Sequence, residues 1–230
     1  MEAIVLAGGF GTRLRNVVPD VPKPMAPIAG RPFLEILLAT LASKGFTRVV
    51  LSLGFMAEKI IEHFGERYAG LDMVFEVESQ PLGTGGAIRA AMARCMEDHV
   101  FVFNGDTYLD VEVDQIERLW QTNRRPVIVV REVPDVARFG SVSMLCGRIL
   151  RFLEKGNHGA GLINAGCYVM PRGVLDHFPI EQPFSLETEF FAPNLQRMRV
   201  DGFVTHGHFI DIGVPEDYAR AQKELAGLLT

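Results

Sequence analysis

The sequence predicts an α/β fold with a mostly parallel (mixed) sheet, helices on both faces and a small antiparallel excursion. Three observations support this class. Short β-branched runs alternate with helical patterns through the first half of the chain, as in successive β-α-β units. Runs such as Val127–Val130 are apolar without alternation, which is typical of strands buried on both faces. The second half brings three strand patterns close together around glycine-containing loops, which favours antiparallel pairing.

The expected elements of the first half follow in chain order. Strand patterns are short and rich in β-branched or aromatic residues, and they cover Ala3–Leu6, Arg48–Leu53, Met73–Val77, Val100–Asn104 and Val127–Val130. Helical patterns repeat apolar residues every three or four positions, and they cover Arg31–Ser43, Met56–Phe64, Gly85–Met96 and Val113–Asn123. Gly45 provides a stop for the first of these helices. Together these elements make the fold Rossmann-like.

In the second half, the regular alternation of strands and helices is expected to end. Three strand patterns cover Ser141–Met144, Ile149–Glu154 and Leu162–Val169. A helix near Glu189–Met198, a strand near Phe203 and a last helix over Pro215–Leu228 complete the prediction. We expect a single domain over residues 1–230, because no linker or composition shift marks a firm boundary.

Composition and charge exclude several classes of protein. The chain has 23 Lys and Arg against 28 Asp and Glu, a formal net charge of −5, without the basic stripe that nucleic-acid binding needs. Its longest apolar runs are far shorter than the roughly 20 residues that span a bilayer. Three widely spaced cysteines favour reduced core thiols, and no secretory leader is recognisable. We therefore expect a cytoplasmic protein without nucleic-acid or membrane partners.

The glycine-rich segment Leu6–Leu14 follows the first predicted strand directly. Glycines let backbone N–H groups approach a polyphosphate without Cβ clashes. The segment is not a P-loop, because no Gly-x-x-x-x-Gly-Lys-Ser/Thr string occurs in the chain, and Leu14 stands where a dinucleotide fingerprint needs its third glycine. Arg13 and Lys23 add two positive charges, which suit the binding of a triphosphate. Taken alone, Lys23 would be interpreted as an ordinary surface lysine.

Two aspartates lie where the sequence expects strand ends. Asp106 follows a buried strand, and Asp211 follows the apolar pair Phe209–Ile210 and precedes a glycine. Two carboxylates together with phosphate oxygens suit Mg²⁺, which accepts few protein ligands. Taken alone, each aspartate has a helix N-cap as its alternative explanation, which for Asp211 carries equal weight.

Five motifs together resemble the sugar-1-phosphate nucleotidylyltransferase family. Leu6–Leu14 with Pro22–Met25 resembles its pyrophosphorylase signature, and the resemblance continues along nearly the whole chain. The further matching segments are Gln80–Ala87, Asn104–Asp106, Phe152–Lys155 with Asn164–Gly166, and Asp211–Tyr218. Within the family, the D-glycero-α-D-manno-heptose 1-phosphate guanylyltransferase branch is the most similar, through Val21–Gly30 and Pro81–Ala87.

The resemblance implies roles for individual residues. The nucleotide would be bound by Leu6, Ala7, Gly8, Gly9, Gly11, Thr12, Gln80, Gly83 and Thr84. The sugar phosphate would be bound by Gly140, Glu154, Lys155, Asn164 and Glu187. Arg13, Lys23 and Asp106 would be catalytic, and Asp106 and Asp211 would hold Mg²⁺. On the residues alone, Glu154–Lys155 would be a surface ion pair and Asn164 and Gly140 ordinary turn residues.

The function implied is transfer of a nucleotidyl group from GTP to D-glycero-α-D-manno-heptose 1-phosphate, for surface polysaccharide or glycan biosynthesis. Residues 1–110 would bind the nucleotide and residues 111–230 the sugar phosphate. Alternatives are a mannose-1-phosphate guanylyltransferase, a UTP-dependent uridylyltransferase and a catalytically silent regulatory subunit. Guanine presents N–H donors, so its reader must offer acceptors such as backbone carbonyls or the Gln80 amide oxygen. The sequence does not determine the oligomeric state, for which a homodimer is one option.

Overall fold

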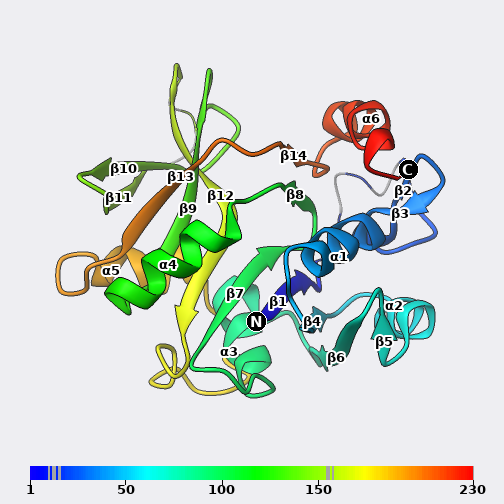
Figure 1. The fold of residues 1–230 in the computed structure, drawn as a ribbon, viewed down its shortest axis with the longest axis horizontal. Helices are drawn as coiled ribbons and strands as arrows, with labels where there is room; N and C mark the ends of the chain where they lie inside the picture. The colour runs from blue at the N-terminus through cyan, green and yellow to red at the C-terminus, as the bar shows by residue number, and fades with distance from the viewer. Residues whose placement is uncertain (10, 12–13, 15–16, 154–155, 157, 230) are drawn as a thin grey trace.

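The fold is built on one ten-stranded mixed sheet, with strand order β10-β11-β13-β9-β12-β7-β1-β4-β6-β5 (Figure 1). The computed structural model describes residues 1–9, 11, 14, 17–153, 156 and 158–229. The strands of this sheet are β1 Glu2–Ala7, β4 Arg48–Leu53, β5 Arg67–Tyr68, β6 Leu71–Val77, β7 His99–Asn104, β9 Val127–Val133, β10 Ser141–Leu145, β11 Arg148–Leu153, β12 Gly161–Pro171 and β13 Asp201–Thr205. The predicted α/β class with a mixed sheet is confirmed.

The strands β7, β1, β4 and β6 form the parallel part of the sheet, and the edge strand β5 pairs antiparallel with β6. Strand β1 lies between β4 and β7 and pairs with both in parallel, and β4 pairs in the same way with β6. Ala3, Ile4 and Val5 of β1 have no exposed surface, because both faces of this strand are covered. The chain reverses its direction of winding at β1, and open α/β sheets bind ligands outside such a switch point.

Helices cover both faces of the sheet, as predicted. Successive residues of a strand point to opposite faces, and Ala3 and Val5 belong to one hydrophobic cluster while Ile4 belongs to another. The first cluster includes residues of α1, α2 and α4, and the second includes residues of α3 and of Leu186–Asn194. The helices are α1 Phe33–Ser43, α2 Ala57–Phe64, α3 Gly83–Met92, α4 Val113–Asn123, α5 Ala192–Asn194 and α6 Pro215–Glu224.

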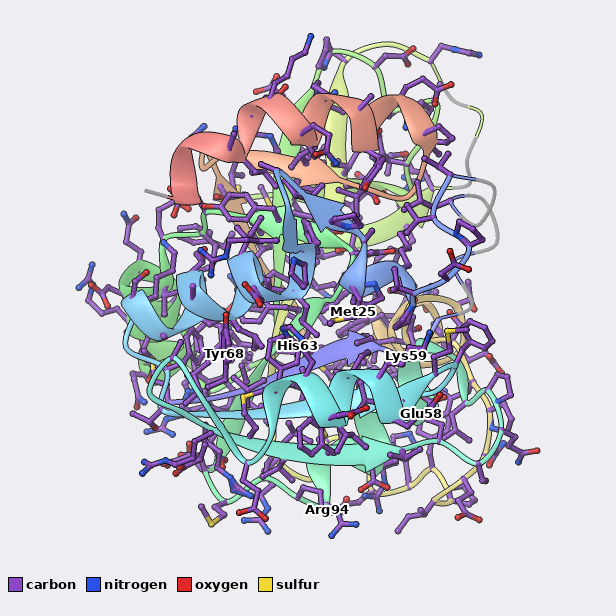
Figure 2. All side chains as sticks on the ribbon, turned by 90° about the vertical axis from the view of Figure 1, so that its right-hand side faces the viewer. Met25, Glu58, Lys59, His63, Tyr68 and Arg94 are labelled. Atoms are coloured by element: carbon purple, nitrogen blue, oxygen red, sulfur yellow. The ribbon has the colours of Figure 1, made fainter. Side chains whose placement is uncertain are left out.

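A polar contact joins α1 and α2, which pack on the same face of the sheet. Glu35 of α1 lies 2.8 Å from the Arg31 Nε and 2.8 Å from the Nε2 of His63 on α2. Figure 2 shows His63 and Tyr68 on the side of α2 and β5 that faces α1. Burial acts to raise the pKa of the Glu35 carboxyl, but the Arg31 and His63 hydrogen bonds outweigh it and hold the pKa below its ordinary value.

The predicted antiparallel excursion is confirmed, and its strands continue the main sheet. The long strand β12 pairs antiparallel with β7 on one side and with β9 on the other, so it joins the two halves of the molecule. The register on β9 shifts between Asn164 and Cys167, which marks a β-bulge. Gly166 in this bulge has φ +72°. The bulge therefore interrupts the sheet beside the carboxyl end of β7.

Several local expectations differ from the structure. The helix expected near Glu189–Met198 is a π-helical segment, η2 Leu186–Phe191, followed by the single turn α5, because Pro193 has no N–H to donate. The helix expected to reach Met96 ends at Met92. Of the three cysteines, Cys95 and Cys167 are buried as expected, whereas Cys146 is exposed in the turn between β10 and β11.

Short elements that the sequence did not reveal complete the fold. Two small sheets pair β2 Pro27–Ile28 with β3 Arg31–Pro32 and β8 Thr107–Leu109 with β14 Phe209–Asp211. The remaining segments are the 3₁₀ turns η1 Lys23–Met25 and η3 Ala226–Leu229. In the part of the chain that the structure describes, no helix combines the length and apolar character needed to cross a bilayer.

We expect Glu112→Gln to destabilise the protein in a pH-dependent way. The Glu112 carboxylate accepts hydrogen bonds from the Thr205 Oγ1 at 2.6 Å and the His206 N–H at 3.2 Å. Burial acts to raise the pKa of Glu112, but these hydrogen bonds outweigh it, so the folded-state pKa lies below the ordinary value of 4.5. The stabilisation is therefore complete above pH 4.5 and is lost as pH falls through the lowered pKa.

Thermal unfolding measures this effect. At pH 7 the Glu112→Gln variant should melt about 2–4 °C below the wild type, and the difference should shrink at pH 3.5, because the stabilisation is lost progressively below the ordinary pKa. Glu62→Gln is the matched control, because Glu62 is exposed on α2. A difference that stays constant between the two pH values would contradict the assignment.

Candidate functional site

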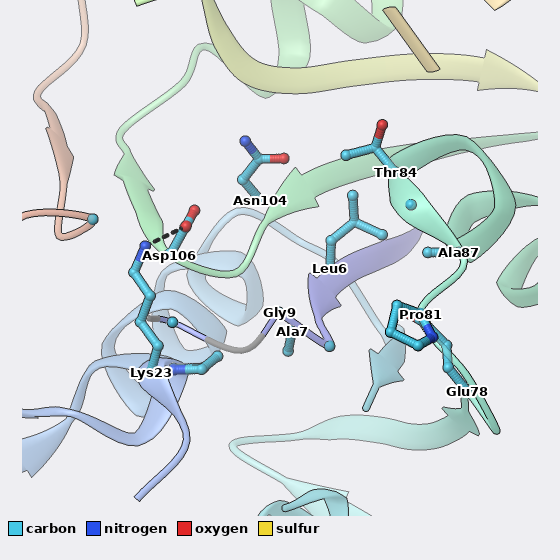
Figure 3. Close-up of a pocket in the computed structure, with 15 residues that line it drawn as sticks. Leu6, Ala7, Gly9, Lys23, Glu78, Pro81, Thr84, Ala87, Asn104 and Asp106 are labelled. Carbon is cyan, nitrogen blue, oxygen red and sulfur yellow. Dashed lines mark hydrogen bonds and ion pairs between the residues drawn. The ribbon is translucent and has the colours of Figure 1, made fainter. Parts of the chain in front are cut away.

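A cleft of about 410 Å³ opens at the carboxyl ends of the parallel strands. Figure 3 shows it between the loop after β1, the turn after β7 and the start of α3. The described residues that line it are Leu6, Ala7, Gly8, Gly9, Gly11, Lys23, Pro24, Glu78, Pro81, Gly83, Thr84, Ala87, Asn104, Asp106 and Gly213. The cleft thus lies at the sheet edge where α/β proteins bind their ligands.

Two glycines of the loop after β1, Gly8 and Gly11, are required by a close contact and by backbone conformation. A Cβ on Gly8 would lie 2.8 Å from the Glu78 Oε1, and a Cβ on Gly54 would lie 2.6 Å from the Gly8 carbonyl oxygen. Gly11 has φ +59°, a conformation that side chains with a Cβ rarely adopt. Gly8, Gly9 and Gly11 therefore present backbone without side chains to the cleft, as phosphate binding requires.

Lys23 forms an ion pair with Asp106 inside the cleft. The Lys23 Nζ lies 2.5 Å from the Asp106 Oδ2, across 83 residues of sequence (Figure 3). The Lys23 side chain is only 10 % exposed, whereas that of Asp106 is 37 % exposed. A largely buried ammonium group needs a charged partner, and Asp106 supplies it. The pair holds a positive and a negative group together on the cleft wall.

The small sheet of β8 and β14 brings Asp106 and Asp211 together. In its register Asp211 is opposite Thr107, and the Ile212 N–H donates to the Asp106 carbonyl oxygen at 3.0 Å. Neither aspartate is a helix N-cap, because Asp106 precedes a strand and the N-cap of α6 is Val214. The backbones of Asp106 and Asp211, which lie 105 residues apart in sequence, are therefore close together.

Gly213 connects the Asp211 carboxylate to the cleft. The Asp211 Oδ1 accepts the Gly213 N–H at 2.6 Å. A Cβ on Gly213 would lie 2.8 Å from this oxygen and 3.2 Å from the Lys23 Nζ, so both groups flank this glycine. No group of three or more His, Cys, Asp and Glu side chains that could hold a metal ion occurs among the described residues. The two carboxylates would need substrate or water oxygens to complete a metal shell.

A hydrogen-bond network links the cleft to the expected sugar pocket. Thr84, on the cleft wall, donates from Oγ1 to the Glu187 Oε2 at 3.1 Å. The Tyr168 hydroxyl donates to the Glu187 Oε1 at 2.7 Å and accepts from the Asn164 Nδ2 at 2.6 Å. Burial raises the pKa of Tyr168 well above its ordinary value, with the Glu187 charge acting in the same direction. Tyr168 is therefore a neutral donor that orients Glu187.

The structure brings most of the predicted residues to two adjacent places. Nine of them line the cleft: Leu6, Ala7, Gly8, Gly9, Gly11, Lys23, Gly83, Thr84 and Asp106. Asn164 and Glu187 share the Tyr168 network, and the Gly140 carbonyl accepts the Asn164 N–H at 3.1 Å. Gln80 is exposed and does not line the cleft. Thr12, Arg13, Glu154 and Lys155 lie outside the described residues.

Sequence reasoning missed three polar residues of this region. Asn104 lines the cleft and lies beside Gly166, where a Cβ would meet the Asn104 Nδ2 at 2.6 Å. Tyr168 is buried within β12, and the apolar strand pattern around it did not mark it as a polar residue of a site. Glu78 lines the cleft just before the predicted Gln80 loop. Asn104 lies within one of the sequence motifs, whereas Tyr168 and Glu78 could be recognised as part of this region only from the tertiary structure.

Two known proteins and a solved structure are similar to this chain over nearly its whole length. The chain is 39% identical to D-glycero-alpha-D-manno-heptose 1-phosphate guanylyltransferase of Aneurinibacillus thermoaerophilus, over 98% of each chain. It is 35% identical to the protein of the same name from Campylobacter jejuni, over 95% of this chain and 97% of that one. HddC from Yersinia pseudotuberculosis complexed with GMP-PN superposes with a TM-score of 0.86 at 36% identity, covering 97% of this chain and 99% of that chain.

A family model adds the last finding. The model described as Nucleotidyl transferase matches residues 2–227, which is nearly the whole chain. This match agrees with the resemblance of the five sequence motifs and with the glycine-lined cleft. The chain belongs to the nucleotidyl transferase family.

Proposed function

We propose that this protein transfers a guanylyl group from GTP to D-glycero-α-D-manno-heptose 1-phosphate, forming GDP-heptose and pyrophosphate. The observation that carries the proposal is the Lys23–Asp106 pair in a glycine-walled cleft at the carboxyl edge of the sheet. The choice of heptose and GTP is supported by the end-to-end similarity to two heptose 1-phosphate guanylyltransferases. The product would feed surface polysaccharide or glycan assembly, and we assign the reaction to the cytoplasm.

The proposed reaction is a single displacement at phosphorus. A phosphate oxygen of the sugar 1-phosphate attacks the α-phosphorus of GTP, and pyrophosphate leaves with the bonding electrons. The attacking phosphate is already an anion near neutral pH, so no general base is needed. Backbone groups of Gly8, Gly9 and Gly11 would hold the triphosphate. Lys23, together with Arg13, would neutralise charge on the α-phosphate and the departing pyrophosphate.

We further propose that Asp106 and Asp211 hold Mg²⁺. Carboxylate oxygens are the hard ligands that this cation prefers, and the small β8–β14 sheet brings the backbones of the two residues close together. A partly exposed Asp106 carboxylate leaves room for substrate oxygens beside it. The bound cation would supply positive charge that offsets the repulsion between two phosphate groups.

The sugar phosphate would lie next to the Tyr168 network. Glu187 can accept hydroxyl protons of the sugar, and Asn164 can both donate and accept. Tyr168 and Thr84 each donate to Glu187 and so limit its orientation. We keep Gly140, Glu154 and Lys155 as sugar-phosphate residues, and Thr12 and Gln80 as nucleotide residues, on the strength of the sequence motifs. Residues 1–110 would thus bind the nucleotide and residues 111–230 the sugar within one domain.

A substrate panel tests this function directly. Pyrophosphate release is measured with Mg²⁺ for GTP, ATP, UTP, CTP and dTTP, each combined with heptose, mannose, glucose and N-acetylated sugar 1-phosphates. We expect strong release only with GTP and the manno-heptose 1-phosphate. Release with GTP and mannose 1-phosphate instead would overturn the heptose assignment. No release with any pair, from folded protein, would favour a regulatory subunit.

Lys23→Ala and Asp106→Asn should each lower kcat by at least about 10²-fold, because each removes a charge that acts on the reacting phosphates. Steady-state pyrophosphate release at saturating substrates gives kcat, and circular dichroism checks the fold. Lys44→Ala is the matched control, since Lys44 forms a comparable pair with Asp110 at 2.6 Å but does not line the cleft. Near-normal kcat in either cleft variant would remove that residue from the mechanism.

Asp211→Asn should raise the Mg²⁺ concentration needed for half-maximal activity by about 10-fold or more, because an amide oxygen is a weaker ligand than a carboxylate. Pyrophosphate release is titrated with MgCl₂ at saturating substrates. Asp72→Asn is the control, because Asp72 is exposed and pairs only with Arg67 among the ion pairs of the described residues. An unchanged Mg²⁺ requirement in Asp211→Asn would exclude Asp211 as a ligand.

A further inference from the structure

The residues proposed to bind the sugar phosphate and the metal lie on separate parts of the fold. Gly140 ends the loop between β9 and β10, and Asn164 lies in β12 of the main sheet. Asp211 ends β14, which pairs with β8 in a sheet of its own and leads into α6. Figure 1 shows α6 on the side of the molecule away from β10 and β11. The reacting phosphate must meet both parts, so contacts between them must fix their separation.

Two neighbouring side chains of the β9–β10 loop join these parts. The Arg138 guanidinium donates from Nη2 to the Oδ2 of Asp217 on α6. The Phe139 ring meets the Phe209 ring of β14 edge to face, with 6.0 Å between the ring centroids. Phe209 and Asp211 lie two residues apart in a strand, so their side chains leave it on the same face. The loop thus contacts β14 on the face from which the Asp211 carboxylate projects.

The same loop is anchored to the sugar side of the site by its backbone. The Gly140 carbonyl oxygen accepts the Asn164 N–H at 3.1 Å, and the Val136 N–H donates to the Gly159 carbonyl oxygen at 3.1 Å. The Asp135 Oδ1 accepts the Gly159 N–H at 3.1 Å. These hydrogen bonds tie the loop to β12 and to the residue pair before it. The loop and the proposed sugar pocket therefore move as one piece.

The ion pair with Arg138 is not needed to compensate the Asp217 charge within α6. Asp217 is only 5 % exposed, but it lies in the first turn of α6, where the helix dipole favours a negative charge. Its Oδ1 also pairs with Arg220 of the same helix, whose Nη1 lies at 3.0 Å. The Arg138 side chain is half exposed, so burial does not force it to find a partner. The separate consequence of the Arg138 pair is the link between α6 and the loop.

We propose that Arg138 is a positioning residue, which holds the β9–β10 loop against α6 through Asp217. The loop then keeps Gly140 and Asn164 at a fixed separation from Asp211, so that the sugar phosphate and the metal meet in the reactive arrangement. The inference rests on the proposed function, to which the sugar-phosphate and metal roles of these residues belong. In this role the guanidinium acts on the loop and does not itself bind the substrate.

Steady-state kinetics of Arg138→Gln test this role, with pyrophosphate release measured against manno-heptose 1-phosphate at saturating GTP and Mg²⁺. The variant should raise the KM for the sugar phosphate about 10-fold and lower kcat/KM about 10- to 100-fold, because a misplaced reactant loses its reactive geometry. Calorimetric titration gives the affinity for GTP in the absence of sugar phosphate. This affinity should stay within about twofold of wild type, since Arg138 is distant from the nucleotide and does not line the cleft.

Asp217→Asn separates positioning from direct binding. Asp217 is buried and cannot bind the substrate itself, yet this variant should reproduce the rise in KM because it weakens the same link. The double variant should lose no more than either single variant, since both remove one interaction. If Arg138 bound the phosphate directly, Asp217→Asn would free the guanidinium and KM would not rise. A rise in Arg138→Gln without one in Asp217→Asn would therefore overturn the inference.

Arg220→Gln is the matched control for a merely structural effect. It removes the other guanidinium from Asp217 but leaves the link to the loop intact. Its melting temperature should fall at least as far as that of Arg138→Gln, whereas its KM for the sugar phosphate should equal that of wild type. An unchanged KM in Arg138→Gln, or an equal rise in Arg220→Gln, would overturn the inference. Failure of the proposed function is a separate result, since wild-type protein would then release pyrophosphate with a different substrate pair or with none.

Discussion

The ion pair between Lys23 and Asp106 is the interaction on which the rest of the site depends. Lys23 is nearly buried, and an unpaired ammonium group in that position would lose its hydration without compensation. The pair joins the loop after β1 to the turn after β7, and the Ile212 N–H adds the segment after β14 through the Asp106 carbonyl. Three segments that are distant in sequence therefore converge at one edge of the sheet. In the proposed reaction, charges held in position in this way would stabilise charge on a reacting phosphate at little cost in reorganisation.

The same edge of the sheet connects the nucleotide cleft to the second half of the chain. Strand β12 pairs with β7, and its bulge at Asn164–Cys167 lies next to the Asn104 side chain at the end of that strand. Tyr168, further along β12, donates a hydrogen bond to the Glu187 carboxylate, and Thr84 donates to the same carboxylate. Because Tyr168 is buried and remains neutral, this network keeps one orientation. Thr84, near the start of α3, and Tyr168 therefore both orient the Glu187 carboxylate, for which we propose a role in sugar binding.

Much of this fold could be predicted from local pattern, and the failures have local causes. The elements β4 and α4 lie where β-branched runs and apolar periodicity indicated. The expected helix near Glu189–Met198 became a π-helical segment and one turn, because Pro193 interrupts the hydrogen bonding and Ser185 caps the earlier start with its Oγ. The strands β8 and β14 were missed because three-residue strands carry too little pattern, although they bring Asp106 and Asp211 together.

The sequence by itself determined the order of most of the longer strands and helices, the glycine-rich segment after β1 and the motifs of a nucleotidyl transferase. These features are local: strand and helix periods, backbone freedom at glycine and motif spacing can each be read within a few residues. Only the tertiary structure decided which polar groups meet, because strand register and the direction of a side chain beyond a strand end depend on long-range pairing. It paired Lys23 with Asp106, brought Asp211 beside them, and turned Glu78 toward the cleft while leaving Gln80 exposed.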